Sequence, residues 1–176
     1  MLRLQGKIIG SFVAQHVEEL EFWVPVMRLR EEGAKVVTIG LSRQTIRGYH
    51  GLEITPEISI DEVEDSSTFD GLVIPGGFAP DFLRRNQKLL QLVYEVYAQG
   101  NIIGSICHGG WVPISAGIVR GHRVTGTTAI KDDIENAGGI WTDIPALRDG
   151  NLVWGRGVDD LPSFCRELIQ ALEKQG

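Results

Sequence analysis

Apolar segments rich in β-branched residues alternate with segments of helical periodicity along the whole chain, and this alternation limits the possible folds more than any other feature. Such alternation is typical of a parallel sheet that is covered by helices on both faces. We therefore expect an α/β protein with a mostly parallel, doubly wound sheet. After a turn at residues 48–51, residues 52–60 are predicted to form an antiparallel, peripheral β excursion. The predicted strands are residues 7–14, 35–41, 69–74, 101–106, 123–126, 140–142 and 152–154, and the predicted helices are residues 18–32, 81–98, 110–116, 130–137 and 161–174.

The size and charge of the chain exclude several classes of protein. Its 176 residues are enough to bury a substantial core without metal or disulfide staples, so we expect a single domain over residues 1–176. The 17 basic and 23 acidic residues give a net charge of -6, and the basic residues are scattered, which argues against a nucleic-acid partner. The sequence has no apolar run of bilayer-spanning length and no signal-peptide core at its start. We expect a cytoplasmic protein without membrane association.

A cysteine stands where a predicted strand meets a predicted helix. The segment is Ser105-Ile106-Cys107-His108-Gly109, which approaches the G-x-S-x-G turn that presents the nucleophile of many hydrolases. At such a turn the thiol leaves the sheet, and the first helical N–H groups point toward it, which lowers its pKa. The alternative is that Cys107 is a small buried hydrophobe at a strand end. The other cysteine, Cys165, lies on the apolar face of the last predicted helix and is interpreted as core packing rather than as a disulfide partner.

Three glutamates at the start of the first predicted helix are candidate partners for this thiol. They are Glu18, Glu19 and Glu21, and the strand before them should end on the same side of the sheet as Cys107. A carboxyl group beside the sulfur can exchange a proton with it if the acid is protonated when the thiol is ionised. Acids in a first helical turn also favour the helix dipole whatever the function. The residues alone leave the choice among the three open.

The remaining candidates lie next to the cysteine or in a Gly-Gly loop. His108 follows Cys107 directly and can serve as a general base if a carboxylate holds it, and Asp81 of this or a neighbouring subunit is the candidate carboxylate. Asp81 as a plain helix N-cap is the competing interpretation. Gly76 and Gly77 end a buried strand, so their N–H groups can approach an oxyanion or an oxidised sulfur; a tight turn without a ligand is the alternative.

Other polar residues give no sign of a metal or cofactor. His16, His50 and His122 stand in or beside turns, where histidine is usually exposed to solvent. The Cys, His and Asp residues do not have the spacing of a zinc site, and the glycine-rich segments match neither the Walker A motif nor the dinucleotide fingerprint. We therefore expect neither a metal nor a nucleotide cofactor.

Several short segments, spread in order over nearly the whole chain, together resemble one family. They are Arg28-Leu29-Arg30-Glu31-Glu32-Gly33, Pro75-Gly76-Gly77-Phe78-Ala79-Pro80-Asp81, Ser105-Ile106-Cys107-His108-Gly109, Ile114-Ser115-Ala116-Gly117-Ile118-Val119-Arg120-Gly121, Ile130-Lys131-Asp132-Asp133, Asn136-Ala137-Gly138 and Asp160-Leu161-Pro162. On these segments the chain resembles the ThiJ/PfpI family, the Parkinsonism-associated deglycase superfamily with a class I glutamine-amidotransferase-like fold.

The resemblance implies a fold and a set of site residues. It implies a flavodoxin-like three-layer sandwich in which Cys107 is the reactive cysteine and Gly77 contributes an N–H beside it. It implies that Glu21, four residues before the helix proline, is the acid that contacts the sulfur. In the PfpI-like branch the histidine after the cysteine, here His108, pairs with an acid of the neighbouring subunit, here Asp81. The protein is then expected to associate with itself as a dimer or hexamer.

The resemblance also implies a range of activities. Members are described as cysteine peptidases, glutathione-independent glyoxalases, protein deglycases, and stress or chaperone proteins. We expect a stress-related cysteine enzyme in which the Cys107 thiolate acts on reactive dicarbonyls or on glycated protein side chains. The alternatives are an intracellular cysteine peptidase of the PfpI type and a non-catalytic redox sensor or chaperone in which Cys107 oxidises to a sulfinate held by Glu21 and Gly77.

The chain departs from the family pattern near the expected crevice. The usual acidic residues after the first strand are replaced by Val13-Ala14-Gln15-His16, and the family's His-Gly-Pro becomes His108-Gly109-Gly110, followed by Trp111. The late Ser-Arg-x-Pro segment becomes Gly155-Arg156-Gly157-Val158. Trp111 either narrows the crevice or packs under the helix, and packing is the commoner fate of a tryptophan. These departures predict a substrate preference that differs from better-known relatives.

Overall fold

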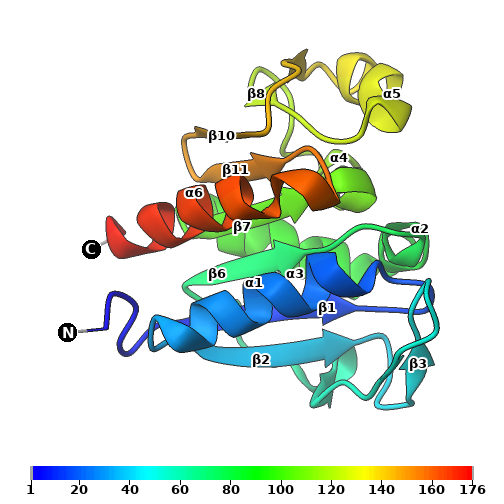
Figure 1. Ribbon diagram of the computed structural model, residues 1–176, viewed down its shortest axis with the longest axis vertical. Coiled ribbons are helices and arrows are strands. Elements are labelled where there is room, and N and C mark those ends of the chain that lie inside the picture. Colours follow the sequence, from blue (N-terminus) through cyan, green and yellow to red (C-terminus); the bar gives the residue numbers. More distant parts are fainter. Residues whose placement is uncertain (1, 176) are drawn as a thin grey trace.

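A seven-stranded sheet with helices on both faces forms the centre of the computed structural model, which describes residues 2–175 (Figure 1). The order of its strands is β10-β11-β7-β6-β1-β2-β5, and every pair is parallel except β10 with β11. The expected mostly parallel, flavodoxin-like fold is confirmed. The strands are β1 (Ile8–Val13), β2 (Lys35–Gly40), β5 (Ile58–Ser59), β6 (Gly71–Ile74), β7 (Ile102–Ile106), β10 (Ala146–Asp149) and β11 (Leu152–Gly155).

Helices cover the two faces of this sheet because each presents an apolar stripe to it. Helices α1 (Glu19–Glu31) and α6 (Leu161–Glu173) pack side by side on the face nearest the viewer in Figure 1, and α3 (Gln87–Ala98) lies behind. In α1 the buried residues Phe22, Val26 and Leu29 recur every three or four positions, as one face of a helix requires. The helix continues through Pro25, which stands near its middle. Cys165 is a buried residue of α6, as predicted, and both cysteines are free.

The carboxyl ends of β1, β6 and β7 meet at one edge of the sheet, since the three strands are adjacent and parallel. This edge faces right in Figure 1, where the arrowheads of the strands point. The segments that directly follow these strands carry Glu18 and the first turn of α1, Gly76 and Gly77, and Cys107. Ligands of open α/β sheets gather at this edge. The topology therefore brings the predicted site residues together from three separate parts of the chain.

The helix predicted at residues 81–98 is wrong, because the chain forms two helices there. Helix α2 (Ala79–Leu83) ends after one turn, and α3 starts at Gln87. The side chain of Asn86 accepts a hydrogen bond from the N–H of Leu89 at 3.0 Å, which caps α3. A capping asparagine competes with a continuous helix by satisfying N–H groups that would otherwise bond within it.

Four short strands also differ from the prediction in their pairing or their presence, namely β5, β8 (Arg123–Val124), β9 (Ile140–Trp141) and β10. Strands β3 (Ile46–Arg47) and β4 (Glu53–Ile54) form the expected antiparallel excursion, but β5 is a parallel edge strand of the main sheet. The Glu57 carboxylate and N–H both bond Thr38, which pulls β5 alongside β2. The structure adds β10, and β8 pairs with β9 in a separate parallel sheet. Helices α4 (Trp111–Ser115) and α5 (Lys131–Asn136) lie where helices were predicted. None of the helices within residues 2–175 is long and apolar enough to cross a membrane.

Candidate active site

Cys107 occupies a strained position at the end of β7. Its φ is 58°, in the left-handed region that residues with a side chain rarely adopt, and a short 3-10 turn at Cys107–Gly110 leads from it into α4. A residue held in this conformation costs the fold about 1–3 kcal/mol, and such residues cluster at functional sites. The predicted sharp turn from strand to helix is therefore present, with the thiol at its corner.

Two kinds of neighbour act on this thiol in opposite directions. Burial and the charge of Glu21 raise the pKa of Cys107 to about 12, whereas hydrogen bonds from the N–H groups of His108 and Gly77 lower it. The N–H groups stabilise a negative charge on sulfur or on an oxygen bound to it. The turn thus supplies the donors of an anion site, and the carboxyl group beside it controls when the charge forms.

Glu21 is the glutamate that meets the sulfur. It is fully buried, its Oε2 accepts the N–H of Gly76 at 2.8 Å, and its carboxyl group lies beside Cys107, where it acts on the pKa of the thiol. Burial and the nearby charge of Glu18 raise the pKa of Glu21 to about 8, so the acid holds its proton at neutral pH. Its Oε1 is buried and accepts no hydrogen bond from residues 2–175, as expected of the oxygen that carries the proton. A neutral Glu21 can donate this proton to a thiolate.

The Gly-Gly loop after β6 gives the acid and the thiol room to meet. A Cβ on Gly76 would collide with the Glu21 carboxyl group and approach Cys107 to 2.9 Å. Gly77 has φ 71°, and its backbone is held in an antiparallel bridge to Val17. Glycine is needed at both positions for these reasons. A tight turn alone accounts for the two glycines, but the N–H of Gly77 also acts to lower the pKa of Cys107.

His108 lies beside the sulfur although it is the next residue in the chain. Its Nδ1 is 3.4 Å from Cys107 Sγ, and its ring packs edge-on against Trp111 at 5.1 Å between centroids. Burial lowers the pKa of His108, so the imidazole is neutral at neutral pH and has a free lone pair. No carboxylate of residues 2–175 forms an ion pair with this ring.

Asp81 is placed away from His108 within one chain. Its carboxylate is 49% exposed and forms an ion pair with Arg85, one turn further along the same segment. The N-cap position of α2 is occupied by Phe78, so the interpretation of Asp81 as an N-cap is wrong. A single chain does not test whether Asp81 reaches a histidine of another subunit, and that role stays a prediction.

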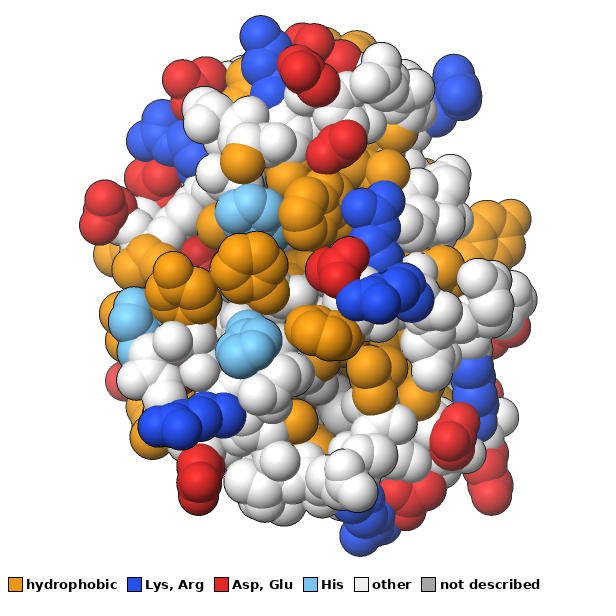
Figure 2. All heavy atoms as spheres, turned by 90° about the vertical axis from the view of Figure 1, so that its right-hand side faces the viewer, with side chains coloured by type: hydrophobic (Ala, Val, Ile, Leu, Met, Phe, Trp, Pro, Cys, Tyr) orange, Lys and Arg blue, Asp and Glu red, His pale blue; other side chains and the backbone are white. Residues whose placement is uncertain are grey.

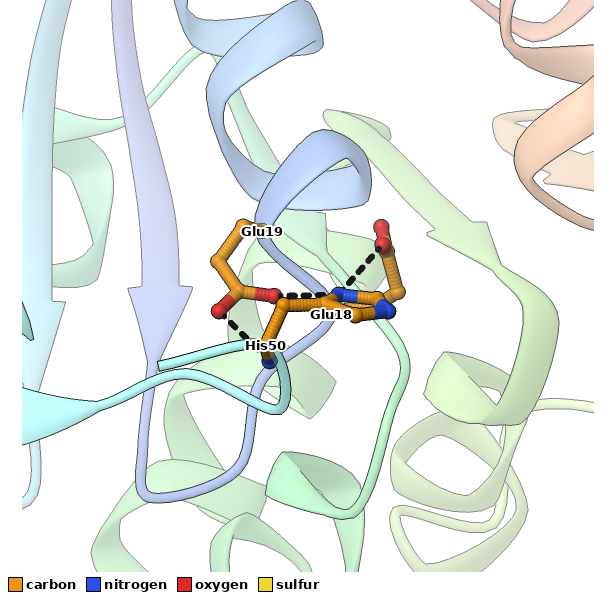
Figure 3. A group of neighbouring side chains, drawn as sticks. All are labelled: Glu18, Glu19 and His50. Atoms are coloured by element: carbon orange, nitrogen blue, oxygen red, sulfur yellow. Dashed lines mark hydrogen bonds and ion pairs between the residues drawn. The ribbon is translucent and has the colours of Figure 1, made fainter. Parts of the chain in front are cut away.

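The other two glutamates have separate tasks (Figure 3). Glu18 caps α1 by accepting the N–H of Glu21 at 2.8 Å. Glu19 binds the loop after β3, where it accepts hydrogen bonds from His50 and Leu52. The ligand atoms of Glu18, Glu19 and His50 lie within 4.8 Å of one another, so this group has the residue types for a metal ion. However, both oxygens of Glu19 already accept N–H groups.

A cavity of about 660 Å³ joins these residues at the carboxyl edge of the sheet. Its polar lining includes Cys107, His108 and Glu21, and its apolar walls are Leu20, Tyr49, Phe78 and Val158. The rings of Tyr49 and Phe78 are 6.1 Å apart, and each residue is more than half exposed. Figure 2 views this edge and shows hydrophobic side chains gathered there, with histidines between them. The sequence analysis did not predict three of these residues, Tyr49, His50 and Phe78, as part of the site. The sequence shows only that they lie in a glycine-flanked turn and next to the Gly-Gly loop, which does not indicate that their side chains face Cys107.

The departures from the family pattern have visible physical reasons. Gly110 faces the ring of Trp154, which leaves no room for a larger side chain. Trp111 packs against the core and donates Nε1–H to Asp133 at 2.8 Å, so the packing interpretation holds, although the ring also touches His108. Arg156 pairs with Asp143 and Asp160, and only Val158 of that late segment lines the cavity.

Comparisons with known proteins agree on one group. The model of the DJ-1/PfpI family matches residues 8–171. The chain is 39% identical over 159 residues to a protein named deglycase TK1284 from Thermococcus kodakarensis, covering 90% of this chain and 95% of that protein. It is 36% identical over 173 residues to general stress protein 18 from Bacillus subtilis, covering 96% of this chain and 99% of that protein.

A solved structure supports the same grouping. It is a two-domain protein from Anabaena variabilis that contains DJ-1/ThiJ/PfpI-like and ferritin-like domains. The TM-score is 0.91 at 36% identity, and the match covers 97% of this chain but 49% of that one. The chain thus spans about half the length of that protein.

Proposed function

The chain belongs to the DJ-1/PfpI family, and from this premise we propose that it is a cysteine-dependent enzyme acting on small reactive dicarbonyls or on their adducts with protein side chains. The observation that carries the proposal is the contact between Cys107 and a protonated Glu21 inside an apolar-walled cavity. A thiol with a proton partner and N–H donors is suited to adding to a carbonyl carbon. The names deglycase and general stress protein, given to relatives, support a stress-related role.

The reaction follows from the positions of these groups. The sulfur of Cys107 adds to the aldehyde carbon of a dicarbonyl while its S–H proton passes to Glu21. Glu21 gives its own proton to the carbonyl oxygen, so a hemithioacetal forms and Glu21 ends the step protonated. Transfer of a hydrogen from the aldehyde carbon to the neighbouring keto carbon turns the hemithioacetal into a thioester of a 2-hydroxy acid. Water, activated by His108, cleaves this thioester and releases the hydroxy acid and the free thiol. The aldehyde carbon of the substrate is oxidised and its keto carbon is reduced, so the reaction needs no external oxidant.

The cavity supports a small, uncharged substrate. Its walls are formed by two aromatic and two aliphatic side chains, and none of its lining residues is a lysine or arginine. Glu18 also lines it. A carboxylate or phosphate group on the substrate would therefore meet a negative charge without a cation to pair with. A compact dicarbonyl with an apolar substituent suits this lining.

We further propose that a neighbouring subunit completes the surroundings of His108. Among residues 2–175 no carboxylate pairs with its ring, and Asp81 is exposed on the surface of α2. In a dimer or hexamer, Asp81 of one subunit would orient His108 of the next. Light scattering gives the oligomeric state. Mixing inactive Asp81→Ala and His108→Ala proteins should restore part of the activity, because some interfaces would then contain both native residues. No restoration by a mixed oligomer would contradict the shared site.

The principal test is turnover of methylglyoxal without glutathione. We expect lactate to form with the wild-type protein, to be lost with Cys107→Ser, and to persist with the control Cys165→Ala, which alters a core thiol instead. Absence of turnover with methylglyoxal, phenylglyoxal and a methylglyoxal-treated arginine peptide would refute the proposal.

Two further assays separate the alternatives. Cleavage of an unmodified peptide that stops in His108→Ala would favour the peptidase. Conversion of Cys107 to a sulfinate by mild peroxide, seen by mass spectrometry in a protein without turnover, would favour the redox sensor.

A further inference from the structure

We propose that His50, held in place by Glu19, is the base that carries the carbon-bound proton of a substrate in the Cys107 cavity. The inference rests on the proposed function and deepens it, because it assigns the hydrogen transfer to a residue that neither touches the sulfur nor belongs to the Cys107 turn. Its basis is the Glu19–His50 pair of Figure 3.

Glu19 is fixed from three directions. Its side chain is 8% exposed, and its Oε1 accepts the N–H of His50 at 2.8 Å and the N–H of Leu52 at 3.2 Å. Its Oε2 lies 2.9 Å from Nδ1 of His50. Gly48 leaves space for this carboxylate, because a Cβ there would collide with it. The loop that carries His50 is thus built around the Glu19 carboxylate.

This contact determines which ring nitrogen is free. Burial acts to raise the pKa of Glu19, but hydrogen bonds from His50 and from the backbone lower it overall, so Glu19 is a carboxylate at neutral pH. A carboxylate accepts hydrogen bonds and donates none, so Nδ1 of His50 must carry the hydrogen. In the neutral imidazole the lone pair is then on Nε2. Among residues 2–175 no group hydrogen-bonds this nitrogen.

The same ring lines the cavity. His50 and Cys107 both contribute to its wall, and Tyr49 packs edge-on against the imidazole at 5.1 Å between centroids. The imidazole is 66% exposed, which leaves it open to a ligand. The charged groups that face it are Glu19 and Glu18, whose Oε1 is 3.6 Å from Nδ1. Both carboxylates stabilise the imidazolium that forms when the ring accepts a proton.

The two histidines of the cavity are therefore unequal bases. His108 touches the sulfur, its pKa is lowered by burial, and no carboxylate in the described part of the chain, residues 2–175, pairs with it. His50 has a fixed carboxylate partner and a free Nε2. This is the arrangement that orients and strengthens the general base of a triad.

The proposed step balances within the substrate. In the hemithioacetal, Nε2 of His50 takes the proton from the carbon bonded to sulfur, and the electron pair of that bond forms an enediolate with the neighbouring carbon. His50 then returns the proton to the former keto carbon. The hydroxyl group on the carbon bonded to sulfur gives its proton to the oxygen of the neighbouring carbon. The first carbon thereby becomes the thioester carbonyl, and its neighbour becomes the alcohol carbon. Proton and electrons stay within the substrate and the imidazole.

The test compares His50→Ala and Glu19→Gln with the control His16→Asn, which changes an exposed histidine that does not line the cavity. We expect kcat for phenylglyoxal to fall about 100-fold in His50→Ala with KM within about twofold, as for loss of a general base. Added imidazole should restore part of the rate, since the vacated position is exposed. The isotope effect on kcat with aldehyde-deuterated substrate should rise. In Glu19→Gln, kcat should fall about tenfold, and added imidazole should not restore it.

Each contrary result has one meaning. A wild-type protein that turns over phenylglyoxal while His50→Ala keeps its kcat would overturn this inference and leave the proposed function standing. If kcat falls in His50→Ala but imidazole does not restore it and the isotope effect does not rise, His50 has a structural role, and this result too would overturn the inference. Activity abolished by a chelator and restored by zinc would make Glu18, Glu19 and His50 metal ligands instead. Absence of turnover in the wild type would overturn both proposals.

Discussion

The two cysteines of this protein share a raised pKa but differ in almost everything else. Burial raises the pKa of Cys165 to about 11, although the charge of Arg28 acts to lower it, and burial with the Glu21 charge raises the pKa of Cys107 to about 12. Cys165 lies on an ordinary helix, whereas Cys107 has φ 58° and contacts N–H donors and a protonated acid. Cys107 is only partly buried and lines the cavity, whereas Cys165 is buried in the core. We propose that this access, the N–H donors and the proton partner together make Cys107 the reactive thiol.

The largest expected effect is the loss of catalytic activity when Cys107, but not Cys165, is replaced. Cys107→Ser should reduce kcat/KM for dicarbonyls by more than about a thousandfold, because a hydroxyl is a far weaker nucleophile than a thiolate. Cys165→Ala should keep the wild-type kcat/KM. Steady-state kinetics on both variants measure this contrast. Equal losses in the two variants would remove the distinction between the cysteines.

The second effect concerns the acid partner that only Cys107 has. Glu21→Gln should lower kcat/KM about 100-fold, the typical contribution of one acid–base group. In the wild type, kcat/KM should rise with pH until about 8, where the Cys107–Glu21 pair gives up its first proton, and should then level off. A pH profile of the variant should lack this inflection. If wild type and variant show the same inflection near pH 8, the proton does not come from this pair.

The raised pKa of Glu21 also makes the stability of the protein depend on pH. The pKa of Glu21 is about 8 in the folded protein against 4.5 for a free glutamate, so the folded state binds the proton more tightly. Its contribution is complete below pH 4.5 and is lost as the pH rises toward 8, at about 1.4 kcal/mol per pH unit. Between pH 5 and pH 7 the free energy of unfolding of the wild type should therefore fall by about 2–3 kcal/mol relative to that of Glu21→Gln. Urea unfolding at both pH values measures the difference; parallel curves would show that Glu21 ionises normally.

The smallest effect belongs to the core cysteine. Cys165→Ala removes a sulfur from the contact between α6 and the core and should lower the free energy of unfolding by about 1–2 kcal/mol. Cys165→Ser should cost more, because it places a hydroxyl among apolar groups. Chemical denaturation gives both values. A Cys165→Ala protein as stable as wild type would mean that the site collapses around the smaller side chain.

Sequence patterns predicted the sheet well because buried strands and glycine-rich turns are local signals. They failed where a few side-chain contacts decide the structure. Asn86 breaks the helix predicted at residues 81–98, and the bonds between Glu57 and Thr38 turn β5 into an edge strand. Neither contact changes the hydrophobic period from which elements are predicted.

The candidate site divides in the same way. The turn at Cys107 has a local signature, so the residues themselves indicate it, whereas the choice of Glu21 among three glutamates came from family resemblance. The pairing of Glu19 with His50 depends on a loop 31 residues away in sequence. Helical periodicity places Glu18 and Glu21 on one face and Glu19 on another but does not say what each face meets. Long-range contacts of this kind appear only in the folded structure.

The proposal that Cys107 is the reactive cysteine and that Glu21 controls its ionisation is tested most directly by site-resolved alkylation. Folded wild-type protein is treated with iodoacetamide over a pH series, and the label on each cysteine is measured by mass spectrometry. The account predicts label on Cys107 at a rate that rises with pH up to about 8, and none on Cys165 until denaturant unfolds the protein. Equal labelling of both cysteines, or an unlabelled Cys107 throughout the series, would contradict it.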